Sequence, residues 1–70
     1  MTTELTHNDV IAVTSYANAD MRLVKGAELA GIDYRTLSVR LDAIYRKTKL
    51  DPKNFRDLTQ LIRMIEEENQ

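Results

Sequence analysis

Apolar side chains recur every three or four residues along most of the chain, and this spacing is the main constraint on its fold. Only an α-helix, with about 3.6 residues per turn, brings such positions onto one face. The two clearest series are Leu37, Leu41 and Ile44, and Leu58, Leu61, Ile62 and Ile65. No sustained alternation of apolar and polar residues indicates a strand. We therefore predict an all-α chain that forms one small four-helix domain over residues 1–70.

The length of the chain limits the core that it can build. Seventy residues make one domain at most, and a core of that size supplies only roughly 3–5 kcal/mol of stability. Pairing with a second copy would therefore help such a chain to stay folded. The residues expected to share one core are Val10, Ile11, Leu23, Ala27, Ile32, Leu37, Leu41, Ile44, Leu58, Leu61 and Ile62.

The first two helices are placed by the residues that can cap them. Thr6 and Asp9 have the spacing of a capping box, in which each side chain bonds the other's backbone N–H, so a helix should begin near residue 7. Asp20 is the expected N-cap of a second, short helix that begins at residue 21 or 22 and ends at Ala30.

The last two helices follow from the same rule. Asp33 should cap a helix over residues 34–47. Asn54, with Asp57 three residues on, should cap a helix that begins at residue 55. The glutamates near the end of that helix oppose its macrodipole, so we expect the tail over residues 66–70 to fray.

Residues 22–47 have the spacing of a helix-turn-helix. Gly31 can take the positive φ of a tight turn, and Ile32 and Leu37 can pin the two helices where they cross. Gly26 and Ala27 are small, which suits a close crossing with another helix. In such a unit the second helix lies in the major groove of DNA and its N-terminal residues contact base edges.

Charge is concentrated in the same part of the chain. The net charge is −1, yet residues 34–56 carry seven basic and two acidic side chains, and both flanking segments are net acidic. A basic middle indicates a surface that meets an anion. The alternative is that these basic side chains only keep a solvent-exposed helix soluble, and the charge distribution by itself favours this alternative.

The outer face of the third helix supplies the expected DNA contacts. The candidates for base contacts are Tyr34, Arg35, Ser38 and Val39. The candidates for contacts to the DNA backbone are Thr36, Arg40, Arg46 and Lys47. Arg35 matches the O6 and N7 edge of guanine, and Val39 suits a thymine methyl. Arg40 could instead form a surface ion pair with Asp42 or Asp33. Tyr34 and Tyr45 could instead be packing residues.

The stretch "LAGIDYRTLSVRLDAIYRKTKLDP" resembles a known family. It is similar to the C-terminal helix-turn-helix of the PucR/CdaR-type bacterial transcriptional regulators, which are related to the Fis-like domains. The pairs Thr36-Leu37 and Arg40-Leu41, then Ile44 and Leu50-Asp51, carry the resemblance, which extends over residues 22–65. The resemblance implies DNA binding and transcriptional control, with Arg40 at the DNA backbone or a base edge.

Other classes of function find little support in the sequence. The chain has no cysteine, and it has no metal-ligand spacing, Gly-rich phosphate loop or grouping of nucleophile and base. We expect no enzyme, cofactor or metal, and we assign no ligand role to His7. The N-terminus lacks the features of a signal peptide and no apolar run reaches membrane-spanning length, so we expect a cytoplasmic protein without a membrane partner.

Two functional hypotheses remain. The first is a regulator of the bacterial or phage type that binds double-stranded DNA, as a homodimer through Phe55 and Ile65 of the last helix or through the first helix. The second is a small helical protein-interaction module without DNA binding of its own, which the net negative charge and the acidic tail favour.

Overall fold

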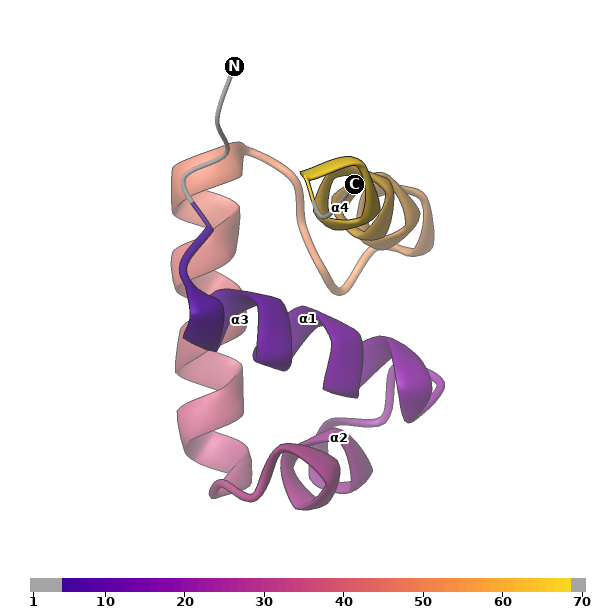
Figure 1. Ribbon diagram of the computed structural model, residues 1–70. Helices are drawn as coiled ribbons and strands as arrows, with labels where there is room; N and C mark the ends of the chain where they lie inside the picture. Colours follow the sequence, from indigo (N-terminus) through magenta and orange to yellow (C-terminus); the bar gives the residue numbers. More distant parts are fainter. Residues whose placement is uncertain (1–4, 69–70) are drawn as a thin grey trace.

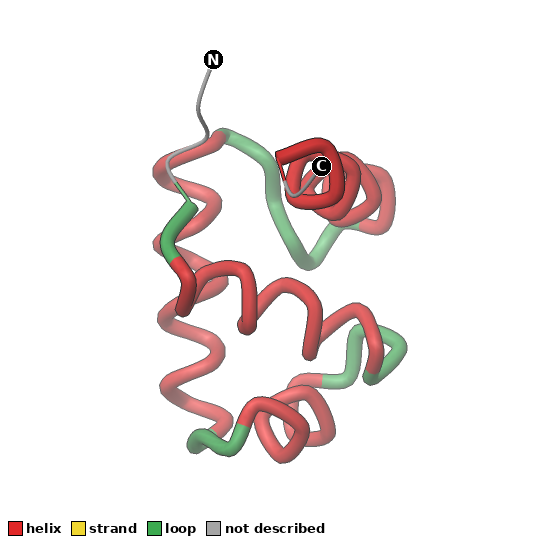
Figure 2. Tube along the Cα trace, in the orientation of Figure 1, coloured by secondary structure: helices red, strands yellow, loops and turns green. Residues whose placement is uncertain are grey.

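The computed structural model describes residues 5–68, and within that range the chain forms four helices and no strand. The helices are α1 (His7–Asn18), α2 (Leu23–Ala30), α3 (Tyr34–Thr48) and α4 (Phe55–Glu68) (Figures 1 and 2). The prediction of a small all-α domain with four helices is confirmed. The glutamates of the tail continue α4 as far as residue 68, and residues 69–70 lie outside the described range.

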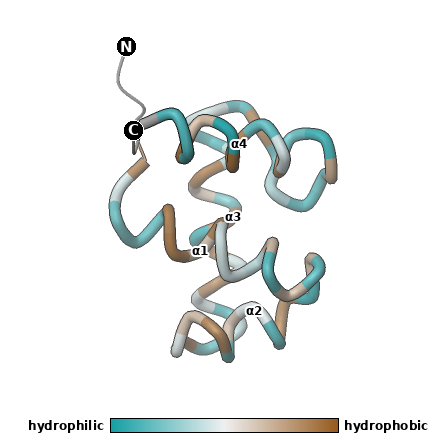
Figure 3. The backbone as a smooth tube through the Cα atoms, turned by 45° about the vertical axis from the view of Figure 1, so that its right-hand side comes forward, coloured by the Kyte–Doolittle hydropathy of each residue, from teal (hydrophilic) through white to brown (hydrophobic). Residues whose placement is uncertain are grey.

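Helix α1 occupies the centre of the arrangement. It packs against α2, α3 and α4, and it crosses the molecule between α2 and α4 with the long α3 beside it (Figure 1). Apolar and polar segments alternate along the helices (Figure 3), as expected when one side of each helix faces a shared interior. α1 therefore sets the positions of the other three helices.

The predicted caps of α1 and α3 are present. The Thr6 hydroxyl accepts from the backbone N–H of Asp9 at 3.2 Å, and the Asp9 carboxylate accepts from that of Thr6 at 3.0 Å. The Asp33 carboxylate accepts from the backbone N–H of Arg35 at 2.7 Å. These bonds satisfy N–H groups that the helices themselves leave open, so both helices begin where the sequence places them.

At α4, only one side of the predicted capping box between Asn54 and Asp57 forms. The Asn54 side chain caps the helix by accepting from the backbone N–H groups of Arg56 and Asp57 at 3.0 and 3.2 Å. The Asp57 carboxylate accepts instead from the backbone N–H of Asp51 at 3.0 Å. It therefore fastens the loop before α4 to the first turn of that helix.

The prediction that Asp20 caps α2 is wrong. Asp20 and Met21 have φ values of 57° and 64°, in the left-handed region, and the backbone N–H of Met21 bonds the carbonyl of Tyr16 at 2.9 Å. These residues therefore close the end of α1, a role that aspartate tolerates because it adopts the left-handed conformation more readily than most residues. Arg22 is the N-cap of α2, with no capping bond from its side chain.

The turn between α2 and α3 has the geometry expected of Gly31. Its φ is 74°, and the N–H groups of Gly31 and Ile32 bond the carbonyls of Glu28 and Ala27 at 3.2 and 3.0 Å. A Cβ at Gly31 would meet nothing within 4 Å. Glycine is therefore favoured here by backbone conformation rather than by space.

The core differs from its prediction mainly in α1. The buried residues of this helix are Asp9, Ala12, Val13, Ser15 and Tyr16, whereas Ile11 lies outside the core. Three neighbouring helices cover α1, so its buried face is broad and takes in small and polar residues that hydrophobicity alone does not select.

The remaining core positions are mostly as predicted. The residues of the buried cluster are Ala12, Val13, Tyr16, Ala27, Leu37, Leu41, Ile44, Leu58, Leu61 and Ile65. Val10, Leu23, Ile32 and Ile62 pack against this cluster but are only partly buried. The prediction that Ile65 remains available for a partner is wrong, since only 7% of the residue is exposed.

Gly26 marks the closest approach between α2 and its neighbours. A Cβ at this position would lie 3.2 Å from the Cα of Tyr16 and 3.2 Å from a methyl group of Leu37. Both distances are shorter than ordinary van der Waals contact. The absence of a side chain at Gly26 therefore lets α1, α2 and α3 meet at one point.

Replacing Gly26 should test this close contact. We expect Gly26→Val to lower the free energy of unfolding by about 1–3 kcal/mol, because the added methyl groups overpack against the α1 backbone. Lys25→Val is the control, since it places the same residue one position earlier on an exposed part of α2. Urea unfolding followed by circular dichroism gives both values, and equal losses would contradict the close-contact explanation.

The buried face of α3 can be tested separately. Leu41 is fully buried, so Leu41→Ala should lower the free energy of unfolding by about 2–5 kcal/mol through lost contacts and a cavity. Val39 is 66% exposed on the same helix, and Val39→Ala should change stability by less than about 0.5 kcal/mol. A thermal melt of Leu41→Ala that matches the wild type would exclude Leu41 from the core.

Candidate nucleic-acid interface on helix α3

Because one side of α3 is buried, only the side chains on its other side are accessible to another molecule. Leu37, Leu41 and Ile44 are fully buried, and the opposite side of the helix faces outward. The exposed or partly exposed residues of that outer surface are Tyr34, Arg35, Thr36, Ser38, Val39, Arg40, Asp42, Tyr45 and Arg46. All four candidates for base contacts therefore lie on the accessible part of α3.

The first turn of α3 holds Arg35 between two neighbours. The guanidinium carbon lies 5.5 Å from the centre of the Tyr34 ring, and Nε is 3.4 Å from an oxygen of Asp33. The Arg35 side chain is still 79% exposed. Contacts of this kind are weak when exposed, so they orient the arginine without removing its donors from reach of another molecule.

Two arginines extend the basic surface along α3. Arg40 is partly exposed and Arg46 is exposed, and neither forms an ion pair with another residue of the range 5–68. The alternative partners considered for Arg40, Asp33 and Asp42, instead pair with Arg35 and Lys53. Arg40 and Arg46 are therefore able to meet an external anion.

Lys47 has a different environment from the other basic residues of α3. Its ammonium group bonds the carboxylate of Asp9, and its side chain is only 29% exposed. The Asp9 carboxylate also completes the capping box of α1. Lys47 thus joins the end of α3 to the beginning of α1, and this contact competes with the predicted contact to a DNA phosphate.

The environment of Asp9 acts on its pKa in two directions. Burial alone would raise the pKa of this carboxyl group, but the hydrogen bonds from Lys47 and Thr6 and the charge of the lysine hold it below its ordinary value. Because the folded-state pKa is lowered, the contribution of this carboxylate to stability is present at neutral pH and is lost as the pH falls through the folded-state value.

Lys53 and two tyrosines complete the surface near α3. Lys53 forms an exposed ion pair with Asp42 at 3.2 Å, which partly neutralises the one acidic residue on the outer surface of α3. Tyr34 and Tyr45 are 45% and 50% exposed, so the packing role considered for them accounts for only half of each residue. The basic charge of residues 34–56 includes Lys53, but its ion pair with Asp42 joins residues eleven positions apart, and no local sequence pattern predicts such a pair.

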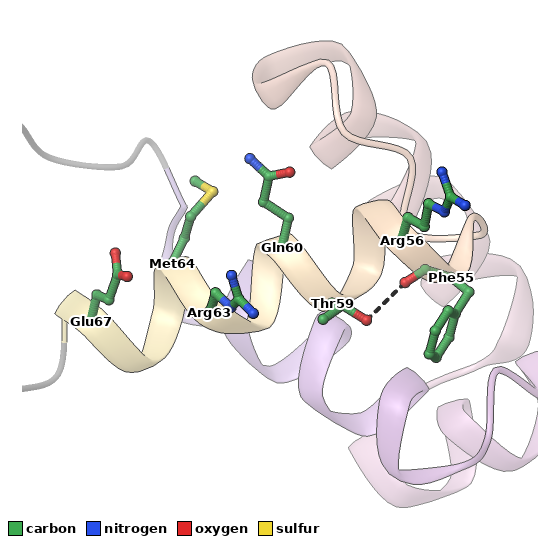
Figure 4. A pocket seen from close by; sticks show the side chains of 7 residues that line it. All are labelled: Phe55, Arg56, Thr59, Gln60, Arg63, Met64 and Glu67. Carbon is green, nitrogen blue, oxygen red and sulfur yellow. Dashed lines mark hydrogen bonds between the residues drawn. The ribbon is translucent and has the colours of Figure 1, made fainter.

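Grooves border α4 on two of its sides among the described residues. One groove runs along the outer side of α4, and all seven described residues that line it, from Phe55 to Glu67, belong to that helix (Figure 4). The other lies between the end of α1 and the first half of α4 and has an apolar lining of Ala17, Met21, Phe55, Leu58 and Ile62. Phe55 borders both grooves and is 73% exposed.

The described residues contain no group of three histidine or acidic side chains able to hold a metal ion. Among the helices between residues 5 and 68, none combines the length and the apolar character needed to cross a bilayer. The chain matches no protein-family model, no curated protein and no solved structure.

The Asp9–Lys47 pair gives a prediction about stability and pH. Lys47→Met should lower the free energy of unfolding at neutral pH by about 1–3 kcal/mol, because it leaves a buried carboxylate without its charged donor. The difference from wild type should shrink as the pH falls below the ordinary range of an aspartate and through the lowered folded-state pKa of Asp9, where the carboxyl takes up a proton. Urea unfolding at several pH values measures both effects.

Arg46→Met is the matched control for this experiment. It removes a neighbouring exposed cation that has no ion pair with a described residue, so its effect should stay within about 0.5 kcal/mol. Equal losses for the two variants, or a Lys47→Met effect that does not change with pH, would contradict a stabilising role for the pair.

Proposed function

We propose that this chain binds double-stranded DNA through the outer surface of α3 and acts as a transcriptional regulator of the bacterial or phage type. The observation that carries the proposal is the presentation of Arg35, Ser38 and Val39 on the accessible side of a helix whose other side is buried. The turn at Gly31 places α2 directly before this helix, as in a helix-turn-helix unit.

The dimensions of α3 suit the major groove. Its 15 residues correspond to a rod about 22 Å long and roughly 10–12 Å wide. The major groove of B-form DNA is about 12 Å wide and admits a single helix. Helix-turn-helix proteins contact base edges with the N-terminal part of this second helix, which is where Tyr34, Arg35, Ser38 and Val39 lie.

The residues of α3 divide into two roles under this proposal. Arg35 offers two parallel donors to the O6 and N7 atoms of guanine, and Val39 packs against a thymine methyl. Arg40 and Arg46 meet phosphates, which adds affinity without reading sequence. Thr36 is also exposed at the first turn, where its hydroxyl can donate to the DNA backbone.

The proposal revises the role of Lys47 and adds one for Lys49. The ammonium group of Lys47 is bonded to Asp9, so we assign its predicted phosphate contact to Lys49, which is exposed just after α3. The resemblance to the PucR/CdaR-type regulators supports DNA binding by this segment. DNA binding in a bacterial cell also accounts for the expected cytoplasmic location.

A protein-interaction module remains the second candidate. The observation that favours it is the apolar groove between α1 and α4, with Phe55 73% exposed at its border. A net charge of −1 also gives no general attraction to DNA. Under this candidate the basic residues of α3 only solvate the helix, and the chain binds no duplex.

Binding isotherms for α3 variants test the proposal. Selection from randomised duplexes at low salt would first identify a preferred site. Arg35→Ala should then weaken binding to that site by about 1–3 kcal/mol and relax preference at one base position. Arg46→Ala should weaken binding to all sequences alike and reduce the salt dependence by about one counterion.

Arg63→Ala is the control, because Arg63 is an exposed arginine on the outer side of α4, outside α3. It should leave both the affinity and the sequence preference of the wild type in place. If the wild type binds no duplex even at low salt, where electrostatic affinity is greatest, the DNA-binding proposal is wrong and the interaction module takes its place.

A further inference from the structure

One line of side chains runs along the middle of the outer side of α3. With about 100° of rotation per residue, these side chains fall within about 60° of one another, opposite the buried leucines and isoleucine of the helix. They are Arg35, Val39, Asp42 and Arg46. When a helix lies in the major groove, the middle of its outer side faces the base edges on the floor of the groove. Asp42, in the middle of this line, is therefore directed at bases rather than at phosphates.

Asp42 is the acidic member of this line, and it has an ion-pair partner outside α3. Its Oδ1 accepts from the ammonium group of Lys53 at 3.2 Å. The Asp42 side chain is still 57% exposed, and within residues 5–68 no donor bonds its other oxygen, Oδ2. One acceptor oxygen therefore stays available to another molecule while the other oxygen is held.

The loop that carries Lys53 is itself held in place. The Asp51 carboxylate accepts from the backbone N–H of Lys53 at 3.0 Å, and the backbone N–H of Asp51 donates to Asp57 of α4 at 3.0 Å. Pro52, between the two loop residues, is fully buried. An exposed ion pair such as Asp42–Lys53 adds little to stability. Its effect is instead to direct the carboxylate of Asp42 from a fixed point on the neighbouring loop.

A carboxylate in the major groove distinguishes the bases, because it can only accept hydrogen bonds. Cytosine offers the N4 amino group as a donor, whereas guanine and thymine offer acceptors that repel a carboxylate. Adenine offers its N6 donor beside the N7 acceptor. Cytosine is therefore the base that the chemistry of Asp42 matches best.

The neighbouring charges make a carboxylate acceptable so close to DNA. An isolated carboxylate is repelled by the phosphates. Here Lys53 offsets the charge of Asp42, and Arg35 and Arg46 lie on the same line of α3. Three positive charges therefore accompany one negative charge, and the surface as a whole still attracts DNA.

We propose that Asp42 is a specificity-determining residue that accepts a hydrogen bond from the N4 amino group of a cytosine, and that Lys53 is the positioning residue that orients it. This assignment rests on the proposed function, because it concerns the same surface of α3. Arg35 and Asp42 lie about 10 Å apart along the helix axis, which is the rise of about three base pairs. The cytosine therefore lies about three base pairs from the guanine that Arg35 contacts.

Selection from randomised duplexes, followed by binding isotherms for the selected sites and their single-base variants, tests the proposal. The wild type should prefer cytosine about tenfold over the other bases at one position. Asp42→Asn should move this preference to adenine, because an amide matches the N6 and N7 atoms of adenine. Asp42→Ala should reduce the preference to within about twofold. The Asp42 side chain is exposed, so circular dichroism should show both variants folded.

Lys53→Met tests the positioning role. It should weaken the cytosine preference at least about threefold in the wild type and leave the base preference of Asp42→Ala unchanged, because its effect passes through Asp42. A lysine that only meets a phosphate would lower the affinity for all sequences equally in both backgrounds. That result would contradict the positioning role.

Glu66→Gln is the matched control, since it removes one negative charge from an exposed site on α4, which does not pack against α3. It should leave the base preference unchanged. If Asp42→Asn also leaves the preference unchanged and only raises the affinity for every sequence, Asp42 acts by repelling phosphates, and the specificity role is wrong while DNA binding stands. If the wild type binds no duplex, the proposed function fails and the role of Asp42 fails with it.

Discussion

The close contact of α1 and α2 at Gly26 is the constraint on which the rest of the structure depends. Because no side chain separates the helices there, a methyl group of Leu37 reaches the same point, and three helices are held together at one place. Leu37 belongs to α3, so its position at this point also fixes the rotation of α3 about its own axis. That rotation decides which residues of α3 are buried and which face outward. The outward position of Arg35 and Val39 therefore follows from a missing side chain on another helix.

The ion pair of Asp9 and Lys47 holds the other end of α3. A single carboxylate caps α1 and bonds a lysine 38 positions away. Packing at Leu37 and the ion pair at Lys47 therefore hold α3 against α1 near both of its ends. These two contacts keep the outer surface of α3 in a fixed position. Rigid presentation favours recognition, since less conformational freedom is lost when a partner binds.

The sequence predicts best those features that depend on neighbouring residues. The caps at Thr6, Asp33 and Asn54 and the turn at Gly31 are each formed by bonds over two to five positions, and all are present. The four helices and most of the core follow from apolar spacing. The wrong cap at Asp20 is local, since Asp20 and Met21 close α1 with left-handed backbone that the capping pattern does not reveal. The other two misassigned residues, Ile11 and Ile65, could not be placed without knowing that α1 is covered on several sides and that α4 packs on it. The accessible surface of α3 was predicted from its period, but the partner of Lys47 was not, because only the fold brings Asp9 beside it.

The two candidate surfaces lie on different helices and share no residue. The N-terminal half of α3 carries one, and the ends of α1 and α4 that border the apolar groove carry the other, while α3 and α4 do not pack against each other. A substitution that alters one surface therefore leaves the chemistry of the other in place. In evolutionary terms, a descendant of this chain could change the residues of one surface while the other surface keeps its sequence.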